Sequence, residues 1–529
     1  MVAVWLVFQV RSWAWWRGDL GQEGFDDVPE SWWEWGSAAD LLLFGPDAGN
    51  WAANARALME GTEPDLNRLP VYGWLTGGMS LIFEDYAFAG HLVNHLASAL
   101  VCVLTYFLGR AMGGRGVGLG AALLVAMLPP LINAQNLYGV DPVMNLMVLL
   151  LILAGWWAMT GPWWAVIVAG VVGGLCASTH YLSLAFPLPV ALLLTLYVGD
   201  GGRRDWARRL AAPVALLCIS WLVFQAMMLP YPPLSLKQAM SVYAEGVVGS
   251  HDRGDLSGEG LGAALSLVSS KLDGAQHTAV QTALSPLLAG LPWWPLLAAF
   301  WVGLVGPLLG RDPRMKWGWD WRAALWLGLL MAPVILLEGA RAPDRYRYYS
   351  APLVMIVVMR GVASLCALAD LGGRRLHERW PRGLLAVLAC AVLAASLFGP
   401  LREDWPANPP LEEGMHERAV GLAVATHFGS GGGVVTLNQS IPFYSGRDRC
   451  PQAQWPAEGE VRRSRQLIRS QCAGSGDLPY ILDEREIEGY ADRRNVALDA
   501  WVSENFSYVE AVSSEGRRTY VYRVPRSAL

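Results

Sequence analysis

Charged residues are scarce in this 529-residue chain. Asp, Glu, Lys and Arg make up only 16% of it, whereas soluble proteins contain about 25%. Lysine occurs only at Lys237, Lys271 and Lys316 while arginine is abundant, a bias that we attribute to genomic base composition. The net charge of −5 and the lack of a basic stripe argue against nucleic acid as a partner.

The sequence also lacks the marks of a metal site and of a cleaved leader. No His and Cys residues stand together at metal-ligand spacing, and the separated His251 and His277 are interpreted as solvated loop residues. The first residues show neither the basic region nor the cleavage site of a signal peptide. We therefore expect no required cofactor, and the sequence leaves metal dependence open.

Hydrophobic residues are plentiful and unevenly distributed. They make up 53% of the chain, which also has 26 tryptophans, a residue enriched where hydrocarbon meets lipid headgroups. Residues 401–529 hold 33 of the 85 charged residues. The pattern predicts a membrane domain over 1–400 and a soluble domain over 401–529.

Apolar runs near the length needed to cross about 30 Å of hydrocarbon predict about eleven transmembrane helices. Ten are predicted at 87–108, 116–135, 142–159, 163–181, 183–198, 210–230, 285–309, 322–340, 349–369 and 383–400. The eleventh candidate is the N-terminus, which is short and interrupted by Arg11. It is either a truncated span or the remainder of one that starts upstream.

Basic loops predict the orientation of these helices. Arginine and lysine gather in four loops, which alternate correctly if all face the cytoplasm: 109–115, 199–209, 310–322 and 370–382. The chain is thus expected to be a multi-pass protein of a bacterial inner membrane, with a cytoplasmic N-terminus. The domain 401–529 and the long loops 18–86 and 231–284 would then be periplasmic.

Two acidic residues fall on the predicted periplasmic side. Asp47 follows Pro46 at the start of a short amphipathic pattern, and Asp141 precedes Pro142 at the start of a span. Each carboxylate has a structural interpretation as a helix cap. The other interpretation is functional, because acidic residues beside a span are costly to keep.

Basic and aromatic residues on the same side suggest an anion. Arg68 lies in the loop that holds Asp47, and its alternative role is a surface arginine that reaches toward headgroups. A second cluster precedes the span 349–369 and comprises Arg345, Arg347, Tyr348 and Tyr349. Positive charge on the outer face would be explained by a lipid phosphate there, although at least one tyrosine fits an aromatic belt.

These residues occur in an order that resembles the GT-C membrane glycosyltransferases, and among them the protein mannosyltransferase and aminoarabinose transferase group. The order comprises Asp47, an A-x-x-L-x-x-G motif (Ala55 to Gly61), Arg68 before Pro70-x-Tyr72, Tyr106-x-x-Gly109-Arg110, Asp141, and RYRYYSAPL. His180 stands near a position where the family often has lysine, so it carries no weight. The resemblance implies a polytopic α-helical GT-C fold.

The resemblance further implies an inverting transfer of a sugar from a polyprenyl phosphate to an acceptor hydroxyl. Asp47 would be the general base and Asp141 a second acid that orients sugar or acceptor. Arg68 and Arg345 would bind the donor phosphate, helped by Arg347, Tyr348 and Tyr349. The sugar, a hexose or a pentose, and the acceptor, a glycan, lipid or protein, are not indicated. The alternatives are a transporter or flippase of lipid-linked sugars and an inactive scaffold of the same fold.

The polar C-terminal segment is expected to form a small α/β domain. A Gly-rich turn enters a strand at 430–440, further strands are predicted at 479–484 and 518–524, and a helix at 460–471. Cys450 and Cys472 lie in this segment, and a periplasmic location makes them a disulfide candidate.

Overall fold

A computed structural model of the chain describes part of it. The described residues are 48–62, 64, 68–84, 86–126, 131, 139–180, 183–184, 186–197, 203–231, 302–303, 351–376, 411–429, 433–434, 441, 445, 448–449, 478–483, 507–514 and 517–524. The predicted N-terminal span, almost all of the span 285–309 and the whole of the spans 322–340 and 383–400 lie outside these residues. The described residues therefore leave the count of eleven spans a prediction.

The first part of the chain is a bundle of helices. Its elements are α2 (Ala48–Glu60), α3 (Pro70–Phe83), α4 (Tyr86–Gly113), α5 (Arg115–Ala126), α7 (Asp141–Thr160), α8 (Trp164–Ala177), α9 (Pro187–Tyr197), α10 (Arg203–Met227) and α15 (Ala351–Leu376). Stretches of α4, α7 and α10 are long and apolar enough to cross a membrane. Seven of these helices, α4 to α10 and α15, coincide with predicted spans.

Small residues bring the bundle helices close together. A Cβ atom at Gly109 of α4 would lie 2.9 Å from the Cα of Gly118 in α5. Gly173 of α8 faces Ser220 of α10, whose hydroxyl donates a hydrogen bond to the carbonyl of Gly170 at 3.0 Å. Close approach at small residues is typical of helices packed within a membrane. Large apolar side chains of the same helices are exposed, for example Leu100 and Leu222, as lipid-facing positions would be.

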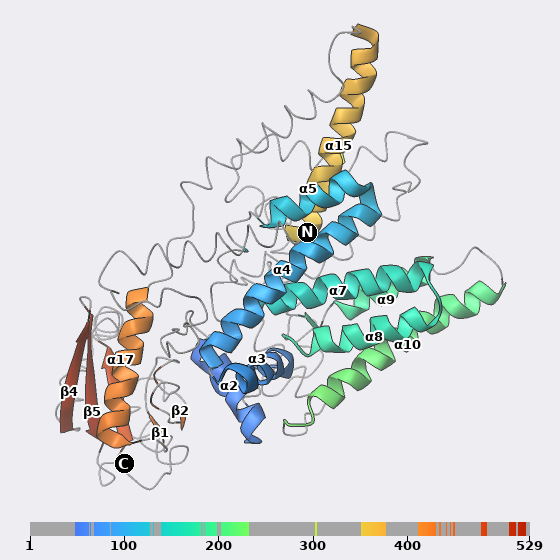
Figure 1. The fold of residues 1–529 in the computed structure, drawn as a ribbon. Coiled ribbons are helices and arrows are strands. Elements are labelled where there is room, and N and C mark those ends of the chain that lie inside the picture. Colours follow the sequence, from blue (N-terminus) through green and yellow to red (C-terminus); the bar gives the residue numbers. More distant parts are fainter. Residues whose placement is uncertain are drawn as a thin grey trace, which may run out of the picture.

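Helices α2 and α3 form a hairpin at one end of this bundle (Figure 1). Gly61 ends α2 with a φ of +68°, a conformation that favours glycine and explains the last position of the A-x-x-L-x-x-G motif. Gly73 of α3 leaves room for Leu58, whose Cδ1 would lie 2.7 Å from a Cβ there. The hairpin is thus packed too tightly for larger residues at that contact.

Two other segments reach the same end of the bundle. The amide of Val71 donates to the carbonyl of Ser178, just after α8, at 3.1 Å. Tyr231, which follows α10, donates its hydroxyl hydrogen to the carbonyl of Arg68 at 2.8 Å. The loop that leads into α3 is therefore held by the ends of α8 and α10, whereas Arg110 and Arg115 lie at the opposite end of α4.

The C-terminal part contains a helix packed on a small sheet. Helix α17 (Leu411–Phe428) precedes the short parallel strands β1 (Gly433–Val434) and β2 (Asp448–Arg449). A second, antiparallel sheet has the order β3-β5-β4, formed by Leu478–Asp483, Arg517–Val524 and Ser507–Ser514. The predicted strands 479–484 and 518–524 correspond to β3 and β5. The predicted helix 460–471 lies outside the described residues.

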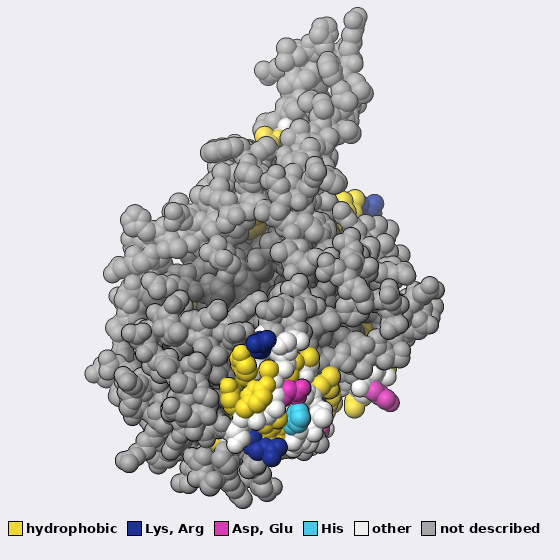
Figure 2. Space-filling model, turned by 90° about the vertical axis from the view of Figure 1, so that its left-hand side faces the viewer, with side chains coloured by type: hydrophobic (Ala, Val, Ile, Leu, Met, Phe, Trp, Pro, Cys, Tyr) yellow, Lys and Arg dark blue, Asp and Glu magenta, His cyan; other side chains and the backbone are white. Residues whose placement is uncertain are grey.

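Apolar contacts and two histidines join α17 to this sheet. Val420 and Val424 pack with Ile481 and Val521 in a buried cluster. His416 and Thr519 share a buried hydrogen bond of 2.7 Å, while an exposed His427 donates to Glu510 at 2.7 Å. On the face seen in Figure 2, hydrophobic side chains lie beside acidic, basic and histidine groups.

Candidate functional site

Two of the predicted site residues, Arg68 and Asp141, belong to the described part of the chain. Asp47 is outside it but directly precedes α2, so the helix predicted to start beside Asp47 is present. The remaining candidates also lie outside the described residues: Arg345, Arg347, Tyr348, Tyr349, Cys450 and Cys472. The geometry below therefore concerns the surroundings of Arg68 and Asp141.

Arg68 lies over an aromatic ring that comes from α2. Its guanidinium carbon is 5.1 Å from the ring centroid of Trp51, within the range of a cation–π contact. Trp51 is 3% exposed and packs edge-to-face on Tyr72 of α3, with 5.4 Å between ring centroids. Arg68 is half-buried, so its charged group is oriented by a rigid surface rather than by solvent.

The backbone of Arg68 is fixed as well. Its carbonyl accepts hydrogen bonds from the hydroxyl of Tyr231 at 2.8 Å and from the side-chain amide of Asn54 at 3.1 Å. Asn54 donates also to the hydroxyl of Tyr231, at 3.1 Å, and is itself buried. These hydrogen bonds fix the backbone at position 68.

Asp141 is the first residue of α7, with Val140 as the preceding cap residue and no side-chain cap bond from it. The carboxylate therefore stands within the first helical turn, where it interacts favourably with the helix dipole. The cap interpretation expected Pro142 to be the first helical residue, and α7 instead begins one residue earlier.

Tyr72 of α3 lies near enough to the start of α7 for the charge of Asp141 to act on its phenol. Its side chain is fully buried. Burial, and secondarily the nearby negative charge of Asp141, raise the pKa of the Tyr72 phenol far above its ordinary value. Tyr72 is therefore a neutral hydroxyl at every physiological pH.

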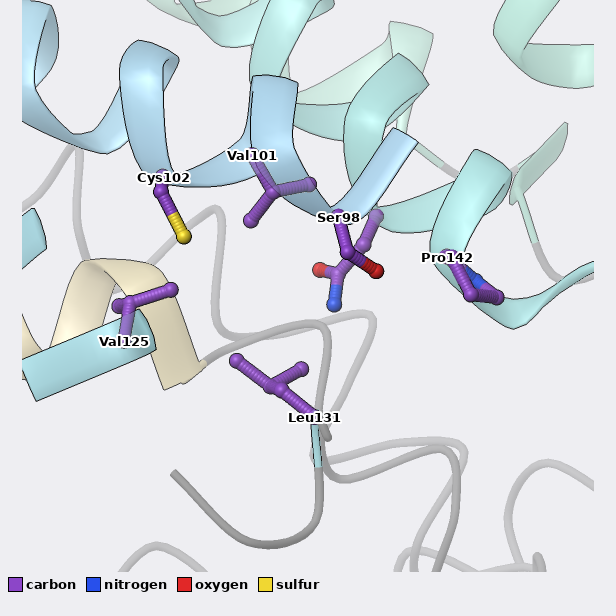
Figure 3. Close-up of a pocket in the computed structure, with 7 residues that line it drawn as sticks. Ser98, Val101, Cys102, Val125, Leu131 and Pro142 are labelled. Atoms are coloured by element: carbon purple, nitrogen blue, oxygen red, sulfur yellow. The ribbon is translucent and has the colours of Figure 1, made fainter. Parts of the chain in front are cut away.

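Further polar side chains lie between α4 and α7. Asn94 and Ser98 stand one turn apart on α4, and Asn145 stands one turn beyond Asp141 on α7. Ser98, Pro142 and Asn145 help to line a cavity of about 20 Å³, seen in Figure 3 between α4 and α7. A cavity of that size has room for one water molecule, and apolar residues such as Val101 and Leu131 form most of its lining.

Helix α15 begins two residues after the cluster Arg345–Tyr349 and runs in the same direction as α4. Ile356 would lie 3.4 Å from a Cβ at Gly109, and the buried Arg360 donates to the carbonyl of Met112 at 3.4 Å. Later residues of α15 thus meet later residues of α4. The two helices are therefore parallel where they meet.

The sequence did not indicate four residues that build these surroundings. Trp51, Asn54 and Tyr231 belong to no motif of the sequence, and Tyr72 belongs only to the Pro-x-Tyr motif. The Pro-x-Tyr motif is the feature of the sequence that could have pointed to Tyr72. A proline that starts a helix places a tyrosine two residues later in the first helical turn. Within the described part of the chain, no three His, Cys, Asp or Glu side chains come close enough to hold a metal ion.

Comparisons with known proteins concern the family and the fold of the chain. The family model described as dolichyl-phosphate-mannose-protein mannosyltransferase matches residues 63–227. A search of curated protein sequences finds no match to the chain. The family match therefore covers α3 to α10, the segment that contains Arg68, Tyr72 and Asp141.

Solved structures extend the likeness in fold. ArnT from Cupriavidus metallidurans, bound to undecaprenyl phosphate, matches with a TM-score of 0.54 at 15% identity, over 93% of this chain and 96% of its own. The oligosaccharyltransferase of Archaeoglobus fulgidus in its apo form matches with a TM-score of 0.57 at 12% identity, over 100% of this chain and 76% of its own. The same archaeal enzyme, AglB, in complex with an inhibitory peptide and a dolichol-phosphate, gives 0.55 at 13% identity. At these identities the likeness is one of fold.

Proposed function

We propose that this chain, whose predicted resemblance to the GT-C membrane glycosyltransferases is confirmed by the family match and the fold, transfers a sugar from a polyprenyl phosphate to an acceptor hydroxyl. The observation that carries the proposal is the guanidinium of Arg68 held over Trp51, which packs on Tyr72 of the same helical hairpin. That pair lies in the hairpin whose first helix starts directly after Asp47.

A phosphate leaving group suits the arginine. As the bond between the anomeric carbon and the phosphate oxygen breaks, negative charge grows on the phosphate, and a guanidinium that stays charged stabilises it. Arg68 is already oriented by Trp51 and by the bonds to its carbonyl. Support for the lipid comes from the neighbours in fold, one bound to undecaprenyl phosphate and another to a dolichol-phosphate.

Asp47 is the proposed general base and Asp141 the second acid. The acceptor oxygen attacks the anomeric carbon opposite the leaving phosphate, its proton passes to the Asp47 carboxylate, and the anomeric centre inverts. A positioned base typically contributes about 10²–10⁴-fold to such a step. Asp141 would orient the sugar or the acceptor through its carboxylate in the first turn of α7.

The cluster Arg345, Arg347, Tyr348 and Tyr349 completes the proposed phosphate site. Five residues separate Ala351 from Ile356 along α15 and fifteen separate Asn94 from Gly109 along α4. At 1.5 Å per helical residue, Ala351 lies about 15 Å from the level of Asn94. Six residues of extended chain reach roughly 20 Å, enough for Arg345 to meet the phosphate that Arg68 binds.

The reaction would take place on the periplasmic face of a bacterial inner membrane. The proposal follows from the basic loops that predict the opposite face as cytoplasmic. Residues 401–529, with α17 and its sheet, would then lie on the same side of the membrane as the proposed site. The sugar, the chain length of the lipid and the acceptor stay open.

Transfer from a panel of radiolabelled polyprenyl-phosphate sugars in membranes tests the proposal, with wild type compared with Asp47→Asn. We expect transfer by the wild type and a loss of about 10²-fold or more in the variant. The matched control is Glu60→Gln, which neutralises an exposed acid at the other end of α2 and should keep full activity. If the wild type consumes no donor, the proposed glycosyltransferase activity is wrong. The transporter and the inactive scaffold then become the favoured alternatives.

A further inference from the structure

The hydroxyl of Tyr231 joins three segments that are far apart in the sequence. It donates a hydrogen bond to the carbonyl of Arg68 at 2.8 Å and accepts one at 3.1 Å from the side-chain amide of Asn54. The same amide nitrogen also donates to the carbonyl of Arg68, at 3.1 Å. Tyr231 and Asn54 are both buried. The hydroxyl thus acts as donor and as acceptor in a closed triangle, and phenylalanine in its place would do neither.

Helix α2 contacts Arg68 at both ends of the residue. Trp51 stands three residues before Asn54 on α2, so the two side chains share one face of the helix. Trp51 contacts the guanidinium of Arg68 at 5.1 Å, and Asn54 contacts its carbonyl. Because an arginine side chain has several rotatable bonds, its guanidinium is held over a ring more firmly when the backbone is fixed relative to that ring. The bonds to the carbonyl therefore affect the position of the charged group.

Tyr231 is itself firmly mounted. Its side chain is 4% exposed and packs in a buried apolar cluster with Leu58 of α2 and with Leu69. In the sequence, Pro230 and Pro232 flank Tyr231, and a proline restricts its own backbone and that of the residue before it. Phenylalanine at position 231 would keep these apolar contacts and remove only the hydroxyl.

We propose that Tyr231 is a positioning residue for the donor: its hydroxyl, bonded to Asn54 and to the carbonyl of Arg68, holds residue 68 so that the guanidinium stays over Trp51 and meets the donor phosphate already ordered. The inference rests on the proposed function and adds a residue that acts through Arg68. A group that is ordered before binding spares the ligand the cost of ordering it. Loss of the hydroxyl should therefore weaken donor binding.

The variant Tyr231→Phe tests this role. We expect the KM for the polyprenyl-phosphate sugar, measured at saturating acceptor, to rise about 3–10-fold. The kcat should stay within about twofold, because the cost of ordering Arg68 is the same for the bound donor and for the transition state. An unchanged donor KM would overturn the proposal, as would a lower kcat at unchanged donor KM.

Ser220→Ala is the matched control. It also removes a buried hydroxyl that donates to a backbone carbonyl, that of Gly170 at 3.0 Å, but this bond joins α8 to α10 and does not involve Arg68. Both variants should lower the midpoint of thermal unfolding in detergent by similar amounts, and only Tyr231→Phe should raise the donor KM. An equal rise of donor KM in Ser220→Ala would show a general loosening of the bundle and contradict the proposal.

A double-mutant cycle with Arg68→Ala tests whether Tyr231 acts through the arginine. Without the guanidinium, fixing the backbone at position 68 has no consequence for the phosphate. Tyr231→Phe should then change the donor KM by less than about twofold when Arg68→Ala is already present. The same increase in both backgrounds would mean that Tyr231 acts on the donor by another route, and the proposal would be wrong.

Binding of undecaprenyl phosphate to the purified full chain gives a readout that needs no transfer. This lipid is the one bound in the ArnT structure. Its Kd should rise about 3–10-fold in Tyr231→Phe and stay unchanged in Ser220→Ala, and an equal Kd in wild type and Tyr231→Phe would overturn the inference. A wild type that binds the lipid but transfers no sugar from any donor would defeat the proposed reaction alone. A wild type that does not bind the lipid would overturn the inference together with the phosphate role of Arg68.

Discussion

The contact between Arg68 and Trp51 determines how this arginine can meet an anion. The indole ring occupies one face of the guanidinium at 5.1 Å, which leaves its edge for hydrogen bonds. That edge makes bidentate bonds to phosphate, a geometry that lysine lacks. The site is therefore expected to be sensitive to the shape of the cation as well as to its charge.

Arg68→Lys tests this sensitivity. Lysine keeps the charge but loses the planar fork and the stacking on Trp51, so the KM for the polyprenyl-phosphate sugar should rise about 10-fold, or roughly 1.4 kcal/mol. Donor titration at saturating acceptor measures it. Arg56→Lys is the matched control, because Arg56 also lies over a ring, that of Tyr86, at 5.7 Å. A lower kcat at unchanged donor KM would contradict a phosphate-binding role for Arg68.

Sequence reasoning identified Arg68 and Asp141 because a charge beside a span is expensive and therefore conspicuous. It could not identify Trp51 in the same way. With 26 tryptophans in the chain, one more in an aromatic-rich loop resembles an interfacial residue. The function of Trp51 depends on which ring and which cation the fold brings to it, and this information is not local.

The packing of α4 on α5 shows how the bundle depends on small residues. A Cβ at Gly118 would lie 2.5 Å from the carbonyl oxygen of Tyr106 and 2.8 Å from the amide nitrogen of Arg110. Both atoms belong to the backbone of α4 and cannot rotate away. Two residues earlier on α5, Gly116 has nothing within 4 Å of its Cβ position.

These two glycines make a matched pair of variants. Gly118→Ala should force α4 and α5 apart and destabilise the protein by about 1–3 kcal/mol, seen as a lower midpoint of thermal unfolding in detergent. Gly116→Ala should leave the midpoint unchanged or raise it, since alanine favours a helix by about 1 kcal/mol over glycine. Equal behaviour of the two variants would show that α4 and α5 do not pack in this way.

Long apolar runs are the feature of the sequence from which the helices could be predicted. The helices α4, α7 and α10 follow directly from them. Helix α3 was not predicted, because its fourteen residues are too few to span and its proline resembles a loop. Helix α17 begins with Leu-Glu-Glu-Gly, and its apolar face is not evident from the sequence. The contacts of Val420 and Val424 with the sheet identify that face.

Across the whole molecule, the fold is shared with solved proteins at only 12–15% identity. A bundle can retain its arrangement under such divergence because its helices need apolar surface and small residues at contacts, and many sequences supply both. The site needs more specific groups. Arg68 and Tyr231 after α10 are bonded to each other only because the ends of these helices share one side of the bundle.

That shared side makes the topology of the chain a test of the proposed reaction. Reporter fusions after Gly114 and Gly201 should be fluorescent with green fluorescent protein, since both residues lie in predicted cytoplasmic loops. Fusions after Tyr231 and Leu529 should instead be active with alkaline phosphatase, which folds only outside the cytoplasm. Tyr231 is the decisive position, because its hydroxyl is bonded to the carbonyl of Arg68. A fluorescent fusion after Tyr231 would put Arg68 and Asp141 on the cytoplasmic side, and a periplasmic transfer reaction at this site would then be wrong.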